Sequence, residues 1–272
     1  MTSDSLSDKF IAQHLSLSQL NYKLFYYFNR CPARTFCYQE VMSYSIGKAA
    51  CIVGYSAQAI EFKVFNTRCP ECRRIGIIYK RARKIDIYIP EYRQEDTLLN
   101  PATLSLLFTI LYTIEKQGIL FHAAGIKFKN KAYLFAGPSR AGKSTLSNLL
   151  SGKVNVLSDE KVIVDRRRYL YGTPWSGDAG YQSIEKGKLK GIFFLKKGRV
   201  NKIEKITVRE AYIILQQCFW APYGNREGME FGAEFILELL KTIPFYRLCF
   251  TKTALASRFL MNHIQNHVME KG

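Results

Sequence analysis

Eight consecutive residues carry the clearest chemical signal in the sequence, because they satisfy the spacing G-x-x-x-x-G-K-[ST] of a phosphate-binding loop. They are Gly137, Pro138, Ser139, Arg140, Ala141, Gly142, Lys143 and Ser144, with Thr145 directly after them. In such a loop, backbone N–H groups and a helix N-terminus surround a phosphate. Lys143 would reach the β- and γ-phosphates, and the Ser144 hydroxyl would bind Mg²⁺. We therefore expect a nucleoside triphosphate site; an ordinary glycine-containing turn is the alternative.

Asp159 and Glu160 form an acidic pair shortly after this loop, following an expected strand over residues 154–157. In a phosphoryl-transfer site, carboxylates in this place hold Mg²⁺ or accept a proton from the attacking group. Acidic turn residues are common, so the position after a phosphate loop is what favours a chemical role here.

The segments around the loop have the patterns needed to position it. Residues 132–136 predict a buried strand and residues 145–150 the first turns of a helix. Upstream, residues 119–136 predict a strand, a turn at 129–131 and a second strand. Downstream, we expect strands at 162–164, 169–171, 190–195 and 246–250, and helices at 207–219, 229–241 and 253–268.

The first part of the chain contains a series of strand candidates, at residues 49–53, 61–65, 75–79 and 85–89. The last of these alternates Ile-Asp-Ile-Tyr-Ile, which predicts one buried face. Asn100 and Pro101 are expected to start a buried helix that runs to about residue 116. We place the boundary after it, between a smaller strand-rich domain at residues 1–115 and a phosphate-loop domain at residues 116–272.

The net charge of +18 is concentrated around the loop. Residues 127–210 hold 19 Lys and Arg against 7 Asp and Glu, a net +12. Such a field attracts nucleotides, nucleic acid or acidic peptides, although a solvated basic surface gives the same count. The apolar run at 104–114 is too short to cross a bilayer, and the N-terminus has no signal-peptide pattern. We expect a cytoplasmic protein that does not enter a membrane.

Two further features of the sequence can each be interpreted in two ways. Cys69 and Cys72 have a C-x-x-C spacing, and Cys31 and Cys37 are the nearest candidates for completing a zinc site. Because the second pair is too widely spaced, we favour reduced thiols. Trp175 lies in a Gly- and Pro-rich loop. That loop could close on a substrate, or the indole could pack into the core.

Four segments, taken in order, resemble the kinase domain of HPr kinase/phosphorylase. They are FHAAG at 121–125, GPSRAGKST at 137–145, LSDE at 157–160 and GTPW at 172–175. They are closer still to the HPr-kinase-related proteins, some of which accompany ribosomally made, modified peptides. The resemblance covers residues 115–250. It implies an α/β fold of the HPr kinase and phosphoenolpyruvate carboxykinase type, which would use ATP and Mg²⁺ to phosphorylate a serine on a peptide or small protein.

The resemblance also implies roles for single residues. Lys143 and Ser144 match the phosphate-binding lysine and the metal-binding hydroxyl, and Asp159 and Glu160 match a base and a carboxylate near the metal. With Asp159 as base, Asp159→Asn is expected to abolish transfer and spare nucleotide binding. His122 matches a histidine close to the phosphates, where it could donate to an oxygen or orient a carboxylate; a core histidine is the alternative. Glu160 replaces the second Asp of HPr kinases, and the later Arg- and Gly-containing signature of the phosphorolytic reaction is not recognisable.

Three functions stay open at this point. The first is a kinase of a serine on a peptide or small protein. The second is a kinase of a small-molecule or RNA hydroxyl, since the basic segment favours an anionic acceptor. The third is a nucleotide-gated binding module without catalysis. Related kinases often assemble as oligomers, so a homo-oligomer is a further expectation.

Overall fold

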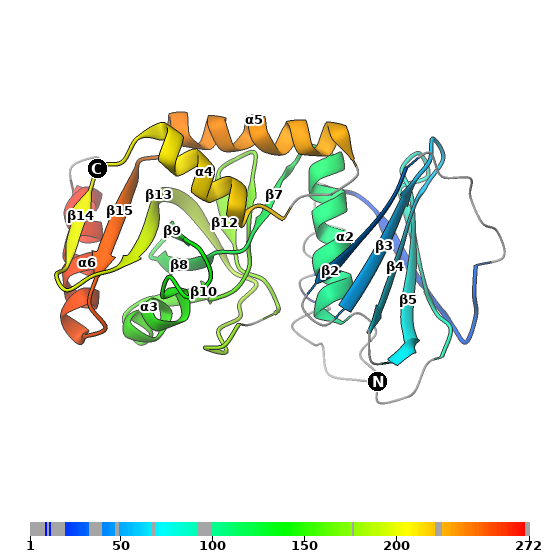
Figure 1. The fold of residues 1–272 in the computed structure, drawn as a ribbon, viewed down its shortest axis with the longest axis horizontal. Helices are drawn as coiled ribbons and strands as arrows, with labels where there is room; N and C mark the ends of the chain where they lie inside the picture. The colour runs from blue at the N-terminus through cyan, green and yellow to red at the C-terminus, as the bar shows by residue number, and fades with distance from the viewer. Residues whose placement is uncertain are drawn as a thin grey trace. The chain divides into compact units, whose positions relative to one another are not determined.

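The computed structural model describes Lys9, Ile11 and residues 20–32, 40–46, 49–66, 69–91, 100–175, 177–220 and 225–269. The chain forms two compact units (Figure 1). The first comprises Met1–Gln117 and Ala221–Phe231, and the second Gly118–Trp220 and Gly232–Gly272. Each unit contains a sheet with both parallel and antiparallel pairs, so the protein is an α/β protein with two strand-rich regions.

The first unit has a six-stranded sheet in the order β1-β6-β5-β4-β3-β2. Its strands are β1 (Lys23–Phe28), β2 (Glu40–Ile46), β3 (Ala49–Tyr55), β4 (Ile60–Asn66), β5 (Cys69–Tyr79) and β6 (Lys84–Ile89). Helix α2 (Pro101–Ile114) is buried over residues 103–113. Its cap is as expected, because the Asn100 side chain accepts a hydrogen bond from the Thr103 N–H at 2.9 Å.

Two expectations for this unit need correction. Strands β1 and β2 correspond to no prediction, because the sequence left residues 1–30 ambiguous between helix and strand and the first strand candidate begins at residue 49. Strand β6 does not have a single buried face, because Asp86 is 3% exposed and forms an ion pair with Lys84 at 2.7 Å. Helix α2 ends at Ile114 rather than near residue 116, since Lys116 has a positive φ of 52° that ends the helical conformation.

The second unit has a nine-stranded sheet in which β10-β8-β9-β13-β12-β11-β7 form the main path. Strand β15 also pairs with β13, and β14 pairs with β15. The strands are β7 (Gly118–Phe121), β8 (Ala124–Phe128), β9 (Lys131–Ala136), β10 (Asn155–Ser158), β11 (Val162–Asp165), β12 (Tyr169–Tyr171), β13 (Lys186–Lys197), β14 (Lys202–Glu204) and β15 (Phe245–Phe250). The helices are α3 (Lys143–Leu150), α4 (Val208–Cys218), α5 (Arg226–Thr242), which begins in the first unit, and α6 (Ala254–Met269).

Local signals explain several of these elements. The apolar run of β9 lies between β8 and the parallel strand β13 and is buried over 132–136. Thr207 and Glu210 form the expected capping box at the start of α4. One expectation was wrong: the single strand expected from residue 119 is two strands, because β7 pairs with β11 whereas β8 pairs with β9 and β10. Among the described residues, no helix is long and apolar enough to span a bilayer.

Candidate functional site

The loop between β9 and α3 contains two positions at which only glycine fits. Gly142 has a φ of 108°, and a Cβ there would meet Phe250 Cζ at 2.7 Å. A Cβ on Gly137 would meet the Ala141 Cβ at 2.9 Å. Gly137 is therefore required by packing, and Gly142 by both packing and conformation.

The start of α3 presents free donors to this loop. The Leu146 N–H donates to the Gly142 carbonyl at 2.9 Å, which begins the helical hydrogen bonds. Within the described part of the chain, the N–H groups of Lys143, Ser144 and Thr145 donate to no carbonyl outside the helix. Such donors, at the positive end of a helix, fit a phosphate group.

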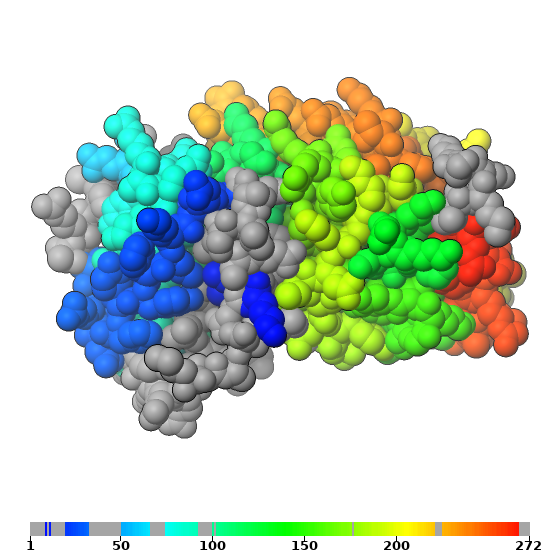
Figure 2. Space-filling view, turned by 180° about the vertical axis from the view of Figure 1, so that it is seen from behind, coloured from blue at the N-terminus to red at the C-terminus, as the bar shows by residue number. Residues whose placement is uncertain are grey.

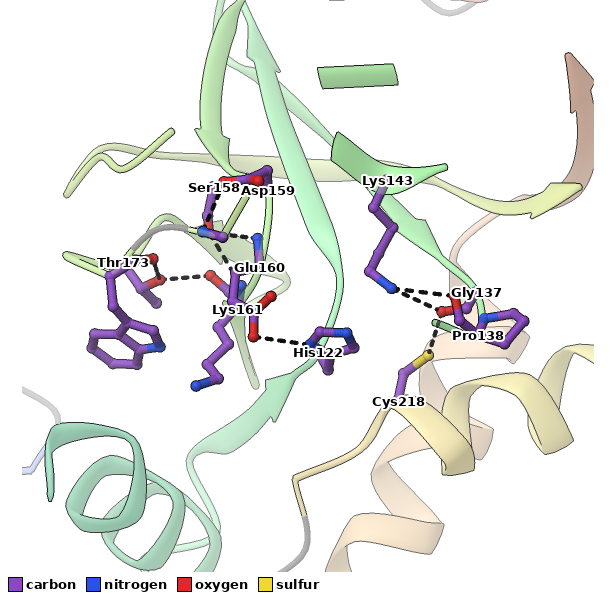
Figure 3. Close-up of polar contacts among 12 residues, drawn as sticks. His122, Gly137, Pro138, Lys143, Ser158, Asp159, Glu160, Lys161, Thr173 and Cys218 are labelled. Atoms are coloured by element: carbon purple, nitrogen blue, oxygen red, sulfur yellow. Dashed lines mark hydrogen bonds and ion pairs between the residues drawn. The ribbon is translucent and has the colours of Figure 1, made fainter. Parts of the chain in front are cut away.

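Lys143 folds back over the loop (Figure 3). Its Nζ donates to the carbonyl oxygens of Gly137 at 3.1 Å and Pro138 at 3.4 Å. Burial lowers the pKa of Lys143, while the charges of Cys218 and Glu160 act in the opposite direction. The ammonium group thus lies against the loop, where a bound phosphate could replace the two carbonyl oxygens as its partner.

His122 and Glu160 form a pair beside the loop (Figure 3). His122 Nδ1 lies 3.4 Å from Glu160 Oε1, and the two side chains are 34% and 31% exposed. Burial works against ionisation of Glu160, but the hydrogen bond from His122 and the charges of His122, Lys161 and Lys143 outweigh it and lower the pKa of Glu160. His122 is therefore not a core histidine. It holds an ionised carboxylate that interacts with the loop lysine.

Strand register brings this pair together. Phe121 of β7 pairs with Val162 of antiparallel β11. His122 follows Phe121 and Glu160 precedes Val162 by two residues, so both lie at the same end of the strand pair. His122 occupies the break between β7 and β8, where its N–H donates to the Cys218 carbonyl at 2.7 Å. The unexpected division into two strands is what places His122 at the site.

Asp159 has a different environment from Glu160. It is 2% exposed, and its carboxylate accepts hydrogen bonds from the N–H groups of Gly177, Ala179 and Tyr181, at 3.0, 2.8 and 3.2 Å. Both carboxylate oxygens are used in these bonds. Asp159 thus fixes the conformation of the 177–181 loop.

Lys161, next to Glu160, is a buried residue that the sequence reading did not single out. Its Nζ lies 4.3 Å from the ring centroid of Trp220 and 6.0 Å from that of Trp175. Burial lowers the pKa of Lys161 to about 8, although the charge of Glu160 acts in the opposite direction. Trp175 is 4% exposed, so its indole is packed inside the unit. The sequence gives one indication of this environment, because the chain has only two tryptophans. The rings of both lie near the Lys161 ammonium group.

The predicted site residues thus separate into groups. Lys143, Glu160 and His122 lie together, whereas Pro138, Ser139 and Arg140 form the exposed tip of the loop.

Among the described residues, no three His, Cys, Asp or Glu side chains are grouped to hold a metal. Mg²⁺ does not need such a group, because it is held by one or two protein oxygens together with substrate phosphates. The partly buried Ser144, at the start of α3, can supply one such oxygen.

The hypothesis of a zinc site concerns cysteines that lie largely outside the described part of the chain. The side chains of Cys69 and Cys72, and all of Cys37, are outside it, while Cys31 is exposed and free.

Comparison with known proteins identifies one family. Residues 93–268, well over half of the chain, match the family model described as SynChlorMet cassette protein ScmC. The matched range includes the phosphate loop, His122, the acidic pair and both tryptophans. A search of curated proteins found no match.

Proposed function

The chain belongs to the ScmC family of SynChlorMet cassette proteins, and from its phosphate loop we propose that it is an ATP-dependent kinase of the HPr kinase type. It would transfer the γ-phosphoryl group to a hydroxyl, in the first place a serine on a peptide or small protein. The observation that supports this most directly is the His122–Glu160 pair beside the loop, in which His122 Nδ1 lies 3.4 Å from Glu160 Oε1 and the pKa of Glu160 is lowered. The loop donors alone can hold the phosphates of a nucleotide, whereas a base for the acceptor hydroxyl must be a positioned carboxylate, so this pair favours catalysis.

Each residue of the site has its own role in the proposed phosphoryl transfer. The α3 N–H groups and Lys143 bind the β- and γ-phosphates, and the Ser144 hydroxyl binds Mg²⁺. When bound, Mg²⁺ neutralises charge on the phosphoryl group. Glu160 accepts the proton of the acceptor hydroxyl, while His122 holds its carboxylate in place. We prefer Glu160 to Asp159 as base, because all the bonds of Asp159 go to the 177–181 loop.

The first test uses γ-labelled ATP and host extract, followed by identification of the labelled species. We expect Glu160→Gln to lower the transfer rate by about a hundredfold or more, because a positioned base contributes on the order of 10²–10⁴. Its Mg·ATP affinity should change by less than about threefold, since Lys143 and the loop donors stay in place. Glu234→Gln, on the exposed surface of α5, is the matched control and should leave transfer unchanged.

Asp159→Asn provides the contrast for this test. An amide nitrogen cannot accept the loop N–H groups, so we expect it to lower the unfolding free energy by about 1–3 kcal/mol. If Asp159→Asn melts like the wild type and has no transfer activity, the base is Asp159 and not Glu160. Tight Mg·ATP binding with no labelled acceptor in any extract would indicate the binding module instead.

A further inference from the structure

A cavity of about 320 Å³ lies in the second unit, away from the phosphate loop. Its lining includes the first residues of β9 and β15 and the N-terminal half of β13. These three strands are parallel, and the phosphate loop follows the other end of β9. The cavity and the loop therefore lie at opposite edges of one sheet. Figure 2 shows the face on which α5 (orange) and α6 (red) border the strands of this unit.

Aromatic rings form one wall of the cavity. Phe193 lies 6.3 Å from Tyr133 and 5.9 Å from Tyr246, between ring centroids. His263 of α6 lies edge-on to Phe193 at 6.0 Å and to Tyr246 at 5.6 Å. The rings hold one another in place, so the wall is preformed for a flat apolar group.

A change of register gives this wall its shape. The pairing of β13 with β9 shifts between Leu189 and Gly191, so Lys190 lies in a bulge. A Cβ on Gly191 would lie 3.2 Å from Tyr133 Cδ1. The absence of a side chain at this position leaves room beside the Tyr133 ring.

The lining also contains four cationic residues. Lys131, Arg168, Lys188 and Lys190 line the cavity, and no Asp or Glu does so among the described residues. Lys188 is partly satisfied, since its Nζ donates to the Arg167 carbonyl. Among the described residues, no hydrogen bond or ion pair partner is found for the ammonium groups of Lys131 and Lys190. Like charges gathered around one cavity repel each other, so an anion there would be favourable.

Arg168 supplies a buried donor at this rim. Its Nη2 lies 3.4 Å from Glu238 Oε2, and its guanidinium lies over the Phe235 ring at 5.4 Å. Its Nη1 is buried and has no hydrogen-bond partner in the described part of the chain. Arg168 thus brings a guanidinium charge to the cavity lining.

We propose that this cavity is a binding site for a small aromatic anion. Its ring would pack against Tyr133, Phe193 and Tyr246, and its phosphate, carboxylate or sulfonate group would bind Arg168 and the two neighbouring lysines, Lys131 and Lys190. The volume is at the lower end of the roughly 300–1,000 Å³ of small-molecule pockets, which suits one ring or a fused pair. The site does not depend on kinase activity.

The test titrates the full-length protein with 8-anilinonaphthalene-1-sulfonate and follows its fluorescence. We expect one saturable site, and at least tenfold weaker binding of the uncharged analogue N-phenyl-1-naphthylamine. Lys131→Glu combined with Lys190→Glu should weaken binding of the sulfonate at least tenfold, as should Arg168→Met alone. Lys205→Glu combined with Arg209→Glu reverses two exposed charges elsewhere in the unit and should change binding less than twofold.

Three results would overturn the proposal. One is equal binding of the sulfonate to the wild type and to the Lys131/Lys190 double variant. Another is equal binding of the charged and uncharged probes. The third is displacement of the probe by Mg·ATP together with loss of binding in Lys143→Ala, because the probe would then report the phosphate loop. Melting temperatures of all variants, measured alongside, identify any loss of folding.

Discussion

At the scale of single residues, the three consecutive residues 159–161 have different environments and different roles. Asp159 is almost fully buried and bonds to three backbone N–H groups, while Glu160 is partly exposed and pairs with His122. Lys161, the next residue, has its ammonium group near the rings of Trp220 and Trp175. Asp159 thus stabilises a loop, Glu160 faces the site, and Lys161 fills the interior behind it.

Lys161 leads to a prediction about pH. Burial lowers its pKa from 10.5 in the unfolded chain to about 8 in the folded protein. Between these two values the unfolded chain binds more protons than the folded one, so this residue makes stability rise with pH. Below pH 8 its burial costs folding free energy. We expect Lys161→Met to raise the unfolding free energy at pH 7 by about 1–3 kcal/mol, measured by urea unfolding.

The advantage of Lys161→Met should shrink as the pH rises from 8 towards 10.5, because the wild-type lysine is then neutral when folded. Lys205→Met, at an exposed position, is the control and should show no such trend. A difference between wild type and Lys161→Met that stays constant with pH would contradict the explanation.

At the scale of elements, helix α3 depends on glycines at both ends for different reasons. Gly142 precedes its first turn with a φ of 108° and contacts Phe250 of β15. Gly152 follows its last turn with a φ of 79°, and a Cβ there would meet nothing within 4 Å. Alanine at Gly152 therefore introduces backbone strain alone, whereas alanine at Gly142 introduces strain together with a clash with Phe250.

We expect Gly152→Ala to cost about 1–2 kcal/mol of unfolding free energy, which is the strain alone. Gly142→Ala should cost roughly 2–5 kcal/mol, because overpacking against Phe250 adds to the strain. Denaturant unfolding measures both values. Gly142→Ala should also lose Mg·ATP binding, whereas Gly152→Ala should retain it. Equal costs at the two positions would show that Phe250 moves aside freely.

At the scale of the whole molecule, the basic charge bears on the acceptor. The net +12 of residues 127–210 lies entirely within the second unit, which also contains the phosphate loop and the aromatic cavity. A basic unit attracts any anionic partner, so charge alone does not distinguish a peptide from RNA. The salt dependence of binding does.

For a peptide acceptor we expect affinity to fall less than about tenfold between 50 and 200 mM salt. RNA held by six or more phosphate contacts would lose roughly a thousandfold or more over the same range. The measurement is acceptor affinity in a salt series, once the labelled species is identified. Mg·ATP affinity in the same series is the control, since the nucleotide is also anionic. A steep dependence would shift the proposal to an RNA hydroxyl.

Features that depend on neighbouring residues could be predicted from the sequence. The loop conformation follows from glycine spacing, the start of α2 from Asn100 and Pro101, and the start of α4 from Thr207 and Glu210. These are local hydrogen bonds and φ requirements. Most strands of the second unit were also expected within a few residues, because their apolar runs are bounded by turn residues.

Contacts between distant segments were decided only by the tertiary structure. Glu160 meets His122 because β11 pairs with β7, and no local pattern specifies that pairing. The Lys161 ammonium group lies near Trp175 and Trp220 for the same kind of reason. The sequence thus determined the glycine-dependent backbone of the loop after β9. The order and register of the strands, which depend on packing across the whole sheet, determined which carboxylate lies beside His122 near this loop.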